Sequence, residues 1–201
     1  IVNITIPDRV TDIGEHIFGG CGSLESITVP FVGSRQYEDC STLGDSNKYK
    51  VLFSYFFGKD DTDTYYNASK LVGLDQRNVG AINSVETPIT LSCVTVRLQT
   101  VIHNGTFFDC DTLVTVNLPY CLTSIEDWAF RTANKLVNVN FINTTEAAEL
   151  MLETIGEAAF YDCISLANFN ANSTYKVYLP ARVTTLENHA FYNCDSIVSL
   201  F

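Results

Sequence analysis

The sequence predicts a β-dominated α/β solenoid, in which successive coils of one chain stack on each other around a shared core. Apolar residues recur at fixed offsets with a period of 23 residues, most completely from Leu113 to Leu136. A period of about 20 to 50 residues is typical of stacked repeat architectures. In the first half of each unit, apolar residues alternate with other residues as in a strand. In the second half they are spaced more widely, up to a Phe.

Composition supports a packed core and excludes two classes of partner. The chain is 46% hydrophobic and 17% charged, which is too apolar for a disordered protein. Its formal net charge is -11, whereas nucleic acids and anionic membrane surfaces are bound by basic patches. No stretch of 18 apolar residues occurs, so no membrane insertion of this segment is predicted.

The repeat unit itself predicts where strands and turns fall. Its first half, L-x-x-V-x-L-P at Leu113–Pro119, alternates like a short strand. Every coil runs the same way, so these strands should form a parallel concave sheet of about seven strands, spaced ~4.8 Å apart. The second half predicts another short strand near Ile125. A short helix or 3-10 turn should follow around Ala129–Phe130, on the other side of the coil.

Taken in order, the units run from the first residue to the last with one large interruption. The first unit spans residues 1–23, and the second begins at Leu24 and loses the register after Pro30. The register returns at Leu91, which leaves an island of about residues 31–90. Two later units are longer, by about seven residues around 144–150 and about eight around 172–178. We therefore expect a single solenoid over 1–201. Each end falls inside a repeat without a polar cap, so we expect a fragment of a longer array, or terminal packing that hides the ends.

The island is rich in aromatic residues, which are densest in Val51–Gly58. One interpretation is an aromatic contact platform, because aromatic side chains are enriched at interface cores. The other is that these residues form the island's own small core, packed against the solenoid, and we favour it. The two interpretations predict different exposure for Tyr65 and Tyr66.

A second spacing, I/L-x-x-x-x-F-x-x-C, recurs four times. It occurs at Ile13/Phe18/Cys21, Ile102/Phe107/Cys110, Ile155/Phe160/Cys163 and Leu186/Phe191/Cys194. With this pattern the chain resembles the BspA-type leucine-rich repeat family over about residues 1–30 and 91–201. Ala133 stands at the Cys position in one unit and departs from the pattern. The resemblance implies a secreted or cell-surface protein of mucosal microbes that adheres to host or microbial proteins, without catalytic residues.

The candidate binding surface is the outward face of the predicted concave sheet. Residues between the apolar strand positions are uncharged and polar, and the charged residues belong to the turn half of each unit. The candidate ligand-binding residues are Ser26, Thr28, Thr95, Thr115, Asn117, Asn138, Asn140, Asn168 and Asn170. We expect a partner that is a protein of a host or microbial surface or matrix, or a glycan. Alternatively, Thr and Asn merely suit an exposed strand, and the module is a spacer that projects another domain, or an enzyme-accessory domain.

The cysteines and histidines predict no chemistry. Four cysteines share one repeat position, where Ala133 is also accepted, which indicates a small packing site with free thiols. A disulfide between Cys163 and Cys194 is the alternative. A metal site is disfavoured because no C-x-x-C pair occurs. No nucleophile motif accompanies the three histidines, so neither an enzyme nor a cofactor is predicted.

Overall fold

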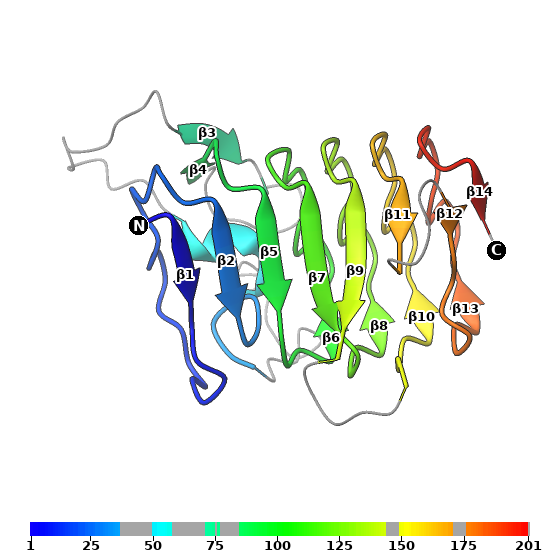
Figure 1. The fold of residues 1–201 in the computed structure, drawn as a ribbon, viewed down its shortest axis with the longest axis horizontal. Helices are drawn as coiled ribbons and strands as arrows, with labels where there is room; N and C mark the ends of the chain where they lie inside the picture. The colour runs from blue at the N-terminus through cyan, green and yellow to red at the C-terminus, as the bar shows by residue number, and fades with distance from the viewer. Residues whose placement is uncertain are drawn as a thin grey trace.

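The chain folds as the predicted solenoid. A computed structural model describes residues 1–36, 50–57, 71–74, 76, 85–143, 149–170 and 176–200. Its coils stack side by side along the long axis of the molecule (Figure 1). One strand of most coils joins an eight-stranded sheet, here the large sheet, in which every pairing is parallel. Its strands, in spatial order, are β1 (Asn3–Thr5), β2 (Ser26–Val29), β5 (Cys93–Val96), β7 (Thr115–Pro119), β9 (Asn138–Ile142), β11 (Asn168–Phe169), β12 (Lys176–Val177) and β14 (Ser199–Leu200).

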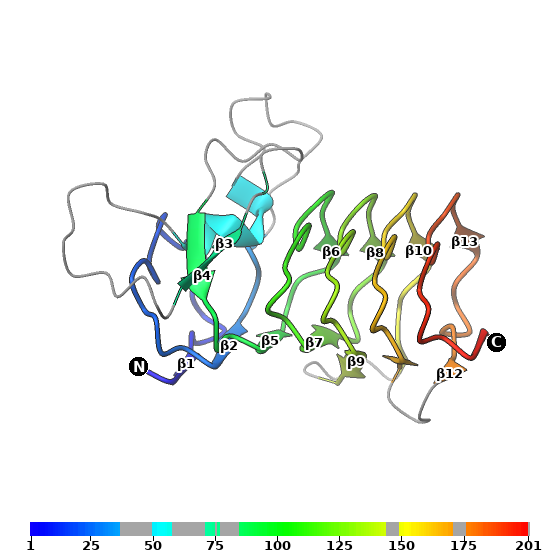
Figure 2. The ribbon, with the colours of Figure 1, turned by 90° about the horizontal axis from the view of Figure 1, so that it is seen from above.

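A second, smaller sheet forms the opposite wall of the solenoid (Figure 2). Its parallel strands are β6 (Val101–Ile102), β8 (Ser124–Ile125), β10 (Thr154–Ile155) and β13 (Thr185–Leu186). These are the short second strands that the repeat predicts. The island contributes an antiparallel pair, β3 (Leu71–Leu74) and β4 (Val85–Pro88), and the 3-10 helix η3 (Phe53–Phe56).

The large sheet has one strand more than the sequence analysis expects. The additional strand is β12, which comes from the segment assigned to extra residues in a long unit. It pairs with β11 through Phe169↔Val177 and with β14 through Val177↔Leu200. In the smaller sheet β13 pairs directly with β10. The extra residues of this unit therefore add a strand to the large sheet and none to the smaller sheet.

Stacked phenylalanines fill the space between the two sheets. Phe107, Phe130 and Phe160 are fully buried. The ring centroids of Phe107 and Phe130 lie 5.0 Å apart, and those of Phe130 and Phe160 lie 4.9 Å apart. Phe191 continues the stack at 5.1 Å from Phe160. The planes of neighbouring rings differ by 13°, 6° and 4°. Since each ring packs on the same residue of the next coil, the core is continuous from coil to coil.

The segment around each of these phenylalanines forms turns rather than a helix. Among the described coils, the residues two before and two after the Phe have positive φ. The residues before it are His16, Gly105, Trp128, Ala158 and His189, and the residues after it are Gly20, Asp109, Thr132, Asp162 and Asn193. Backbone N–H groups of these turns donate to the next coil, as in Phe107 N to Ala129 O at 2.7 Å and Phe130 N to Ala159 O at 2.8 Å. The turns are thus a third hydrogen-bonded column beside the two sheets.

Thr132 is an unfavourable residue for this turn, and its replacement tests the assignment. Its φ is 61°, whereas the equivalent positions hold Gly, Asp or Asn, which enter the left-handed region more easily. We expect Thr132→Asn to raise the free energy of unfolding by about 0.5–1 kcal/mol, measured by urea denaturation. The reverse substitution, Asn193→Thr, should lower it. A shift of the same sign in both variants would contradict the argument.

Residues 50–57 of the island pack into the solenoid, in the place of a turn. The backbone N–H groups of His16 and Phe18 donate to the carbonyls of Tyr55 and Phe56, each at 2.9 Å. On the other side, Phe53 N donates to Thr106 O at 2.8 Å. This segment therefore stands between the turn of the first unit and the turn of the unit that begins at Leu91.

The aromatic side chains of this segment belong to the solenoid core. Phe56 packs on Phe18 with ring centroids 5.7 Å apart, and Phe53 packs on Phe107 at 5.3 Å. The described aromatics of the island are all buried: Phe31, Phe53, Tyr55, Phe56 and Phe57. They form neither an exposed platform nor a separate island core. Tyr37, Tyr49, Tyr65 and Tyr66 lie outside the described residues.

Candidate binding surface

The outward positions of the large sheet carry two rows of polar side chains. In β2, β5, β7 and β9 these positions alternate with fully or nearly fully buried apolar ones, and they are half-buried. Identical repeat positions pair across the sheet, as in Thr115↔Asn138 and Asn117↔Asn140, so the rows run across the strands. We call these rows the polar ladder: Asn3, Thr5, Ser26, Thr28, Cys93, Thr95, Thr115, Asn117, Asn138, Asn140 and Asn168.

Side-chain hydrogen bonds join the rungs of the polar ladder. Asn138 Nδ2 donates to Thr115 Oγ1 at 3.2 Å, and Asn168 Nδ2 donates to Asn138 Oδ1 at 2.7 Å. In the second row, Asn117 Nδ2 donates to Thr95 Oγ1 and Asn140 Nδ2 to Asn117 Oδ1, both at 2.9 Å.

At the N-terminal edge of the polar ladder, Ser26 Oγ donates to Asn3 Oδ1 at 2.7 Å. Each of these donors bonds to the preceding coil.

These bonds orient the amides. An Asn side chain has two N–H donors and an acceptor oxygen with two lone pairs. Among the described contacts, Asn138 gives one N–H to Thr115 and accepts one bond from Asn168, which leaves a second N–H and a second lone pair for a partner. The ladder therefore holds an ordered, uncharged set of donors and acceptors, and fixing them in advance lowers the entropy cost of binding.

Most predicted site residues lie together on this face, and one lies beyond the end of its strand. Ser26, Thr28, Thr95, Thr115, Asn117, Asn138, Asn140 and Asn168 all occupy outward positions. Asn170 follows the end of β11 and has a φ of 61°, so its backbone departs from the strand conformation there. Cys93, which was not among the predicted site residues, lies in the ladder, with its Sγ 3.7 Å from Asn117 Nδ2.

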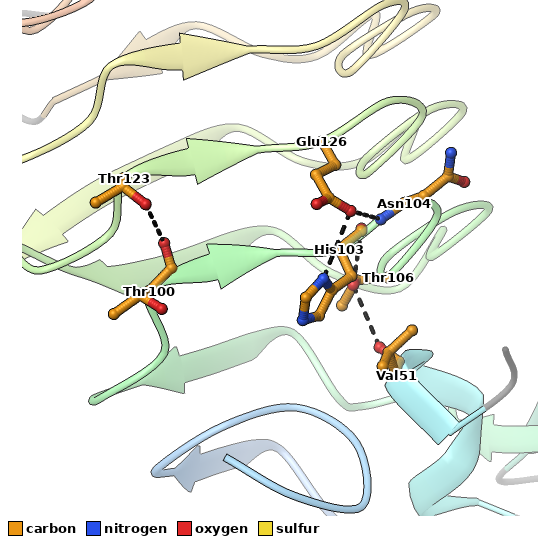
Figure 3. A network of polar contacts seen from close by, with 7 residues as sticks. All are labelled: Val51, Thr100, His103, Asn104, Thr106, Thr123 and Glu126. Atoms are coloured by element: carbon orange, nitrogen blue, oxygen red, sulfur yellow. Dashed lines mark hydrogen bonds and ion pairs between the residues drawn. The ribbon is translucent and has the colours of Figure 1, made fainter. Parts of the chain in front are cut away.

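A polar network on the opposite side connects neighbouring coils and the island segment (Figure 3). Glu126 Oε2 accepts a hydrogen bond from Asn104 N at 2.9 Å and lies 3.5 Å from His103 Nδ1. The buried Thr106 hydroxyl lies 2.9 Å from His103 O and 3.2 Å from Val51 O. These contacts hold coils and island together.

The six described cysteines are free thiols, as favoured from the sequence: Cys21, Cys93, Cys110, Cys121, Cys163 and Cys194. The alternative disulfide between Cys163 and Cys194 is not formed. Instead, each thiol donates to a carbonyl of the preceding coil, Cys163 to Phe130 O at 3.0 Å and Cys194 to Phe160 O at 3.1 Å. Burial raises the pKa of Cys163 well above its ordinary value and that of Cys194 to about 12.

These raised pKa values predict slow alkylation of the folded protein. Only the thiolate is a good nucleophile, and a group with a raised pKa stays protonated until the pH approaches that value. At pH 8 we expect Cys110, Cys163 and Cys194 to resist iodoacetamide until the protein unfolds, while the partly exposed Cys21 reacts. Peptide mass spectrometry of native and urea-unfolded samples checks this. Equal labelling of Cys163 and Cys21 in the native protein would contradict it.

The described part of the chain contains neither a metal-ligand cluster nor a membrane-spanning helix. It holds no group of three or more His, Cys, Asp or Glu side chains placed to bind a metal ion. It also holds no helix that is long and apolar enough to cross a membrane.

Sequence reasoning did not single out Gln76, which connects the island to the solenoid. Its side chain is completely buried. Its Oε1 accepts from Ser54 N at 2.8 Å, and its Nε2 donates to Phe108 O at 2.9 Å and Thr106 O at 3.1 Å. A lone Gln in an irregular segment carries no sequence signal for such a role.

Comparison with known proteins then decides the family. The family model described as BspA type leucine-rich repeat region matches residues 1–57 and 149–201, with 6 copies, which together are more than half of the chain. This chain belongs to the BspA-type leucine-rich repeat family. Between the matched ranges of this BspA-type protein, the coils of residues 91–143 keep the same pairing register.

One solved structure supports the same architecture. A leucine-rich repeat protein from Bacteroides ovatus ATCC 8483 is 22% identical, with a TM-score of 0.53, over 100% of this chain and 37% of its own. The BspA-type chain thus spans well under half of that protein. A T. pallidum leucine-rich repeat protein is 19% identical with a TM-score of 0.49, covering 99% of this chain and 68% of its own.

A protein of Faecalibacterium prausnitzii A2-165, described as a leucine rich cell surface protein, is 20% identical to the BspA-type chain. Its TM-score is 0.40, and the match covers 100% of this chain and 56% of its own. No curated protein sequence matches the chain.

Proposed function

We propose that this chain is a non-catalytic binding module of a secreted or cell-surface protein, and that the polar ladder binds its partner. The partner is a protein of a host or microbial surface or matrix, or a glycan presented there. The observation that carries the proposal is the ladder itself: oriented, uncharged donors and acceptors on an uninterrupted run of parallel strands from β1 to β11. Family membership supports the location.

A second candidate function rests on the same hydrogen bonds. Because the rungs bond to each other, Thr and Asn at these positions also stabilise the stacking of coils without any ligand. Under this alternative the module is a spacer that projects another domain, and changes on the ladder alter stability without altering adhesion.

Asn140→Arg distinguishes the two functions. Among the described contacts, Asn140 donates one ladder bond, to Asn117, so the substitution removes one bond and adds a long charged side chain to the neutral face. We expect it to weaken binding to immobilised mucosal matrix protein by about ten-fold or more, because a partner fitted to a neutral face must desolvate the new charge. Biolayer interferometry measures the change.

Asn188→Arg is the matched control, because Asn188 is an exposed residue on the turn side and undergoes the same change of charge. Denaturation curves of both variants separate lost stability from lost binding. If both variants bind as the parent does, or if both lose binding equally, the ladder is not the binding surface.

A further inference from the structure

A strip of aromatic and basic side chains runs along the turn side of three neighbouring coils. Trp128 and Arg131 come from one coil, Tyr161 from the next, and His189 and Tyr192 from the one after. They occupy the repeat positions two before and one after the stacked phenylalanines. We call these five residues the aromatic strip. None of them belongs to the polar ladder.

The aromatic strip already holds a guanidinium between two rings. The Cζ atom of Arg131 lies 5.1 Å from the Trp128 ring centroid and 4.7 Å from the Tyr161 centroid. Tyr192 stacks against Tyr161 at 4.7 Å with an interplanar angle of 15°, and the His189 ring lies edge-on to both tyrosines. Within about 6 Å of a ring centroid, a cation is attracted by the ring quadrupole. The spacing of these coils therefore suits a planar cation.

Exposure and charge favour an external cation as well. Tyr192 is 52% exposed, and His189 is exposed. Four acidic residues lie near the strip. Asp127 precedes Trp128 and Asp162 follows Tyr161 in sequence, and Glu187 lies two residues before His189. The backbone carbonyl of Glu157 accepts a hydrogen bond from Trp128 N at 3.0 Å. Glu157 and Glu187 are exposed. The chain carries a formal net charge of -11, so the turn side complements a basic partner, whereas the polar ladder is neutral.

We propose that the aromatic strip is a second docking surface, and that it takes arginine side chains of a basic peptide segment. Arginine suits it better than lysine, because the planar guanidinium stacks on ring faces and forms paired hydrogen bonds with carboxylates. The surface is separate from the polar ladder and does not depend on it.

The protein contains its own reporter for this site, because Trp128 is the single tryptophan of the chain. We expect a deca-arginine peptide to change Trp128 fluorescence in a saturable way, and deca-lysine to bind more weakly. Tyr192→Leu removes an exposed ring and Glu157→Gln removes a negative charge near Trp128, so each should weaken deca-arginine binding by about three-fold. Asn140→Ser, on the polar ladder, should leave it unchanged.

Arg131→Ser and Lys135→Ser separate a ring site from general charge attraction. Both remove one positive charge from the same coil, but only the first vacates the position between Trp128 and Tyr161. We expect Arg131→Ser to tighten deca-arginine binding more than Lys135→Ser does. The proposal is overturned if the peptide leaves Trp128 emission unchanged, if Tyr192→Leu binds like the parent, or if the two serine variants behave alike. Near-UV circular dichroism confirms that each variant is folded.

Discussion

Replacing Phe130 with Ala is expected to lower the free energy of unfolding by about 3–5 kcal/mol, as measured by urea denaturation. The side chain is fully buried and stacks on both neighbours, Phe107 at 5.0 Å and Phe160 at 4.9 Å. Its removal opens a cavity that reaches two coil interfaces. In a solenoid each coil is stabilised mainly by its neighbours, so a cavity at two interfaces weakens the whole stack.

Phe191→Ala is the matched comparison. Phe191 is half-buried and, among the described residues, has one parallel stacking partner, Phe160 at 5.1 Å. We expect a smaller loss than for Phe130→Ala, because less apolar surface returns to water and one stacking interface is opened. Equal losses in the two variants would show that position in the stack does not determine stability, and would contradict the coil-by-coil argument.

The repeat spacing was sufficient to predict the stack of phenylalanines that the Phe130 and Phe191 variants test. A fixed period places Phe130 and Phe160 at the same position of successive coils, and a sheet with one buried face has a strongly specified register. The pairings Ser26↔Cys93 and Thr115↔Asn138 follow the repeat positions even across the island. The pairing of strands that are distant in sequence could be predicted here because the same strand pattern recurs in successive units.

Elements without a repeated signal could not be predicted. β12 consists of Lys176 and Val177, too short for a periodicity to be recognised. It is a strand because β11 and β14 offer backbone hydrogen bonds on both sides. The turns present the same difficulty: Trp128 and Thr132 have positive φ, which their residue types disfavour. Hydrogen bonds from Trp128 N to Glu157 O and from Thr132 N to Tyr161 O hold them there.

The outward placement of the strand residues could be predicted, but not the hydrogen bonds between their side chains. Alternation alone places Asn117 and Asn138 on the outer face. Whether an amide donates to the next rung depends on its rotamer and on the neighbour's side chain, which sequence does not give. The island shows a similar limit. The aromatic density of Val51–Gly58 indicated burial, but not that Phe53 and Phe56 would complete the core of the coils on either side.

The second large effect is expected from Gln76→Leu, which should lower the free energy of unfolding by about 2–4 kcal/mol. The substitution keeps much of the volume and removes every side-chain hydrogen bond of a completely buried residue. Ser54 N loses its acceptor Oε1, and Phe108 O loses the donor Nε2. Backbone groups that are buried without a partner carry their full desolvation cost, whereas a leucine returns only some apolar contact.

The effect should also be local. Gln76 connects η3 to the turn after β6, so its loss should loosen residues 50–57 before the rest of the solenoid. Hydrogen exchange should rise at Phe53–Phe57 and stay unchanged at residues 150–170. Gln99→Leu is the control, because Gln99 is buried and accepts from Val32 N at 3.0 Å. It should cost less, since among the described contacts one backbone partner is lost instead of several. If exchange at Phe53–Phe57 is unchanged in Gln76→Leu, the island segment is held by its phenylalanines, and the buried amide contributes little.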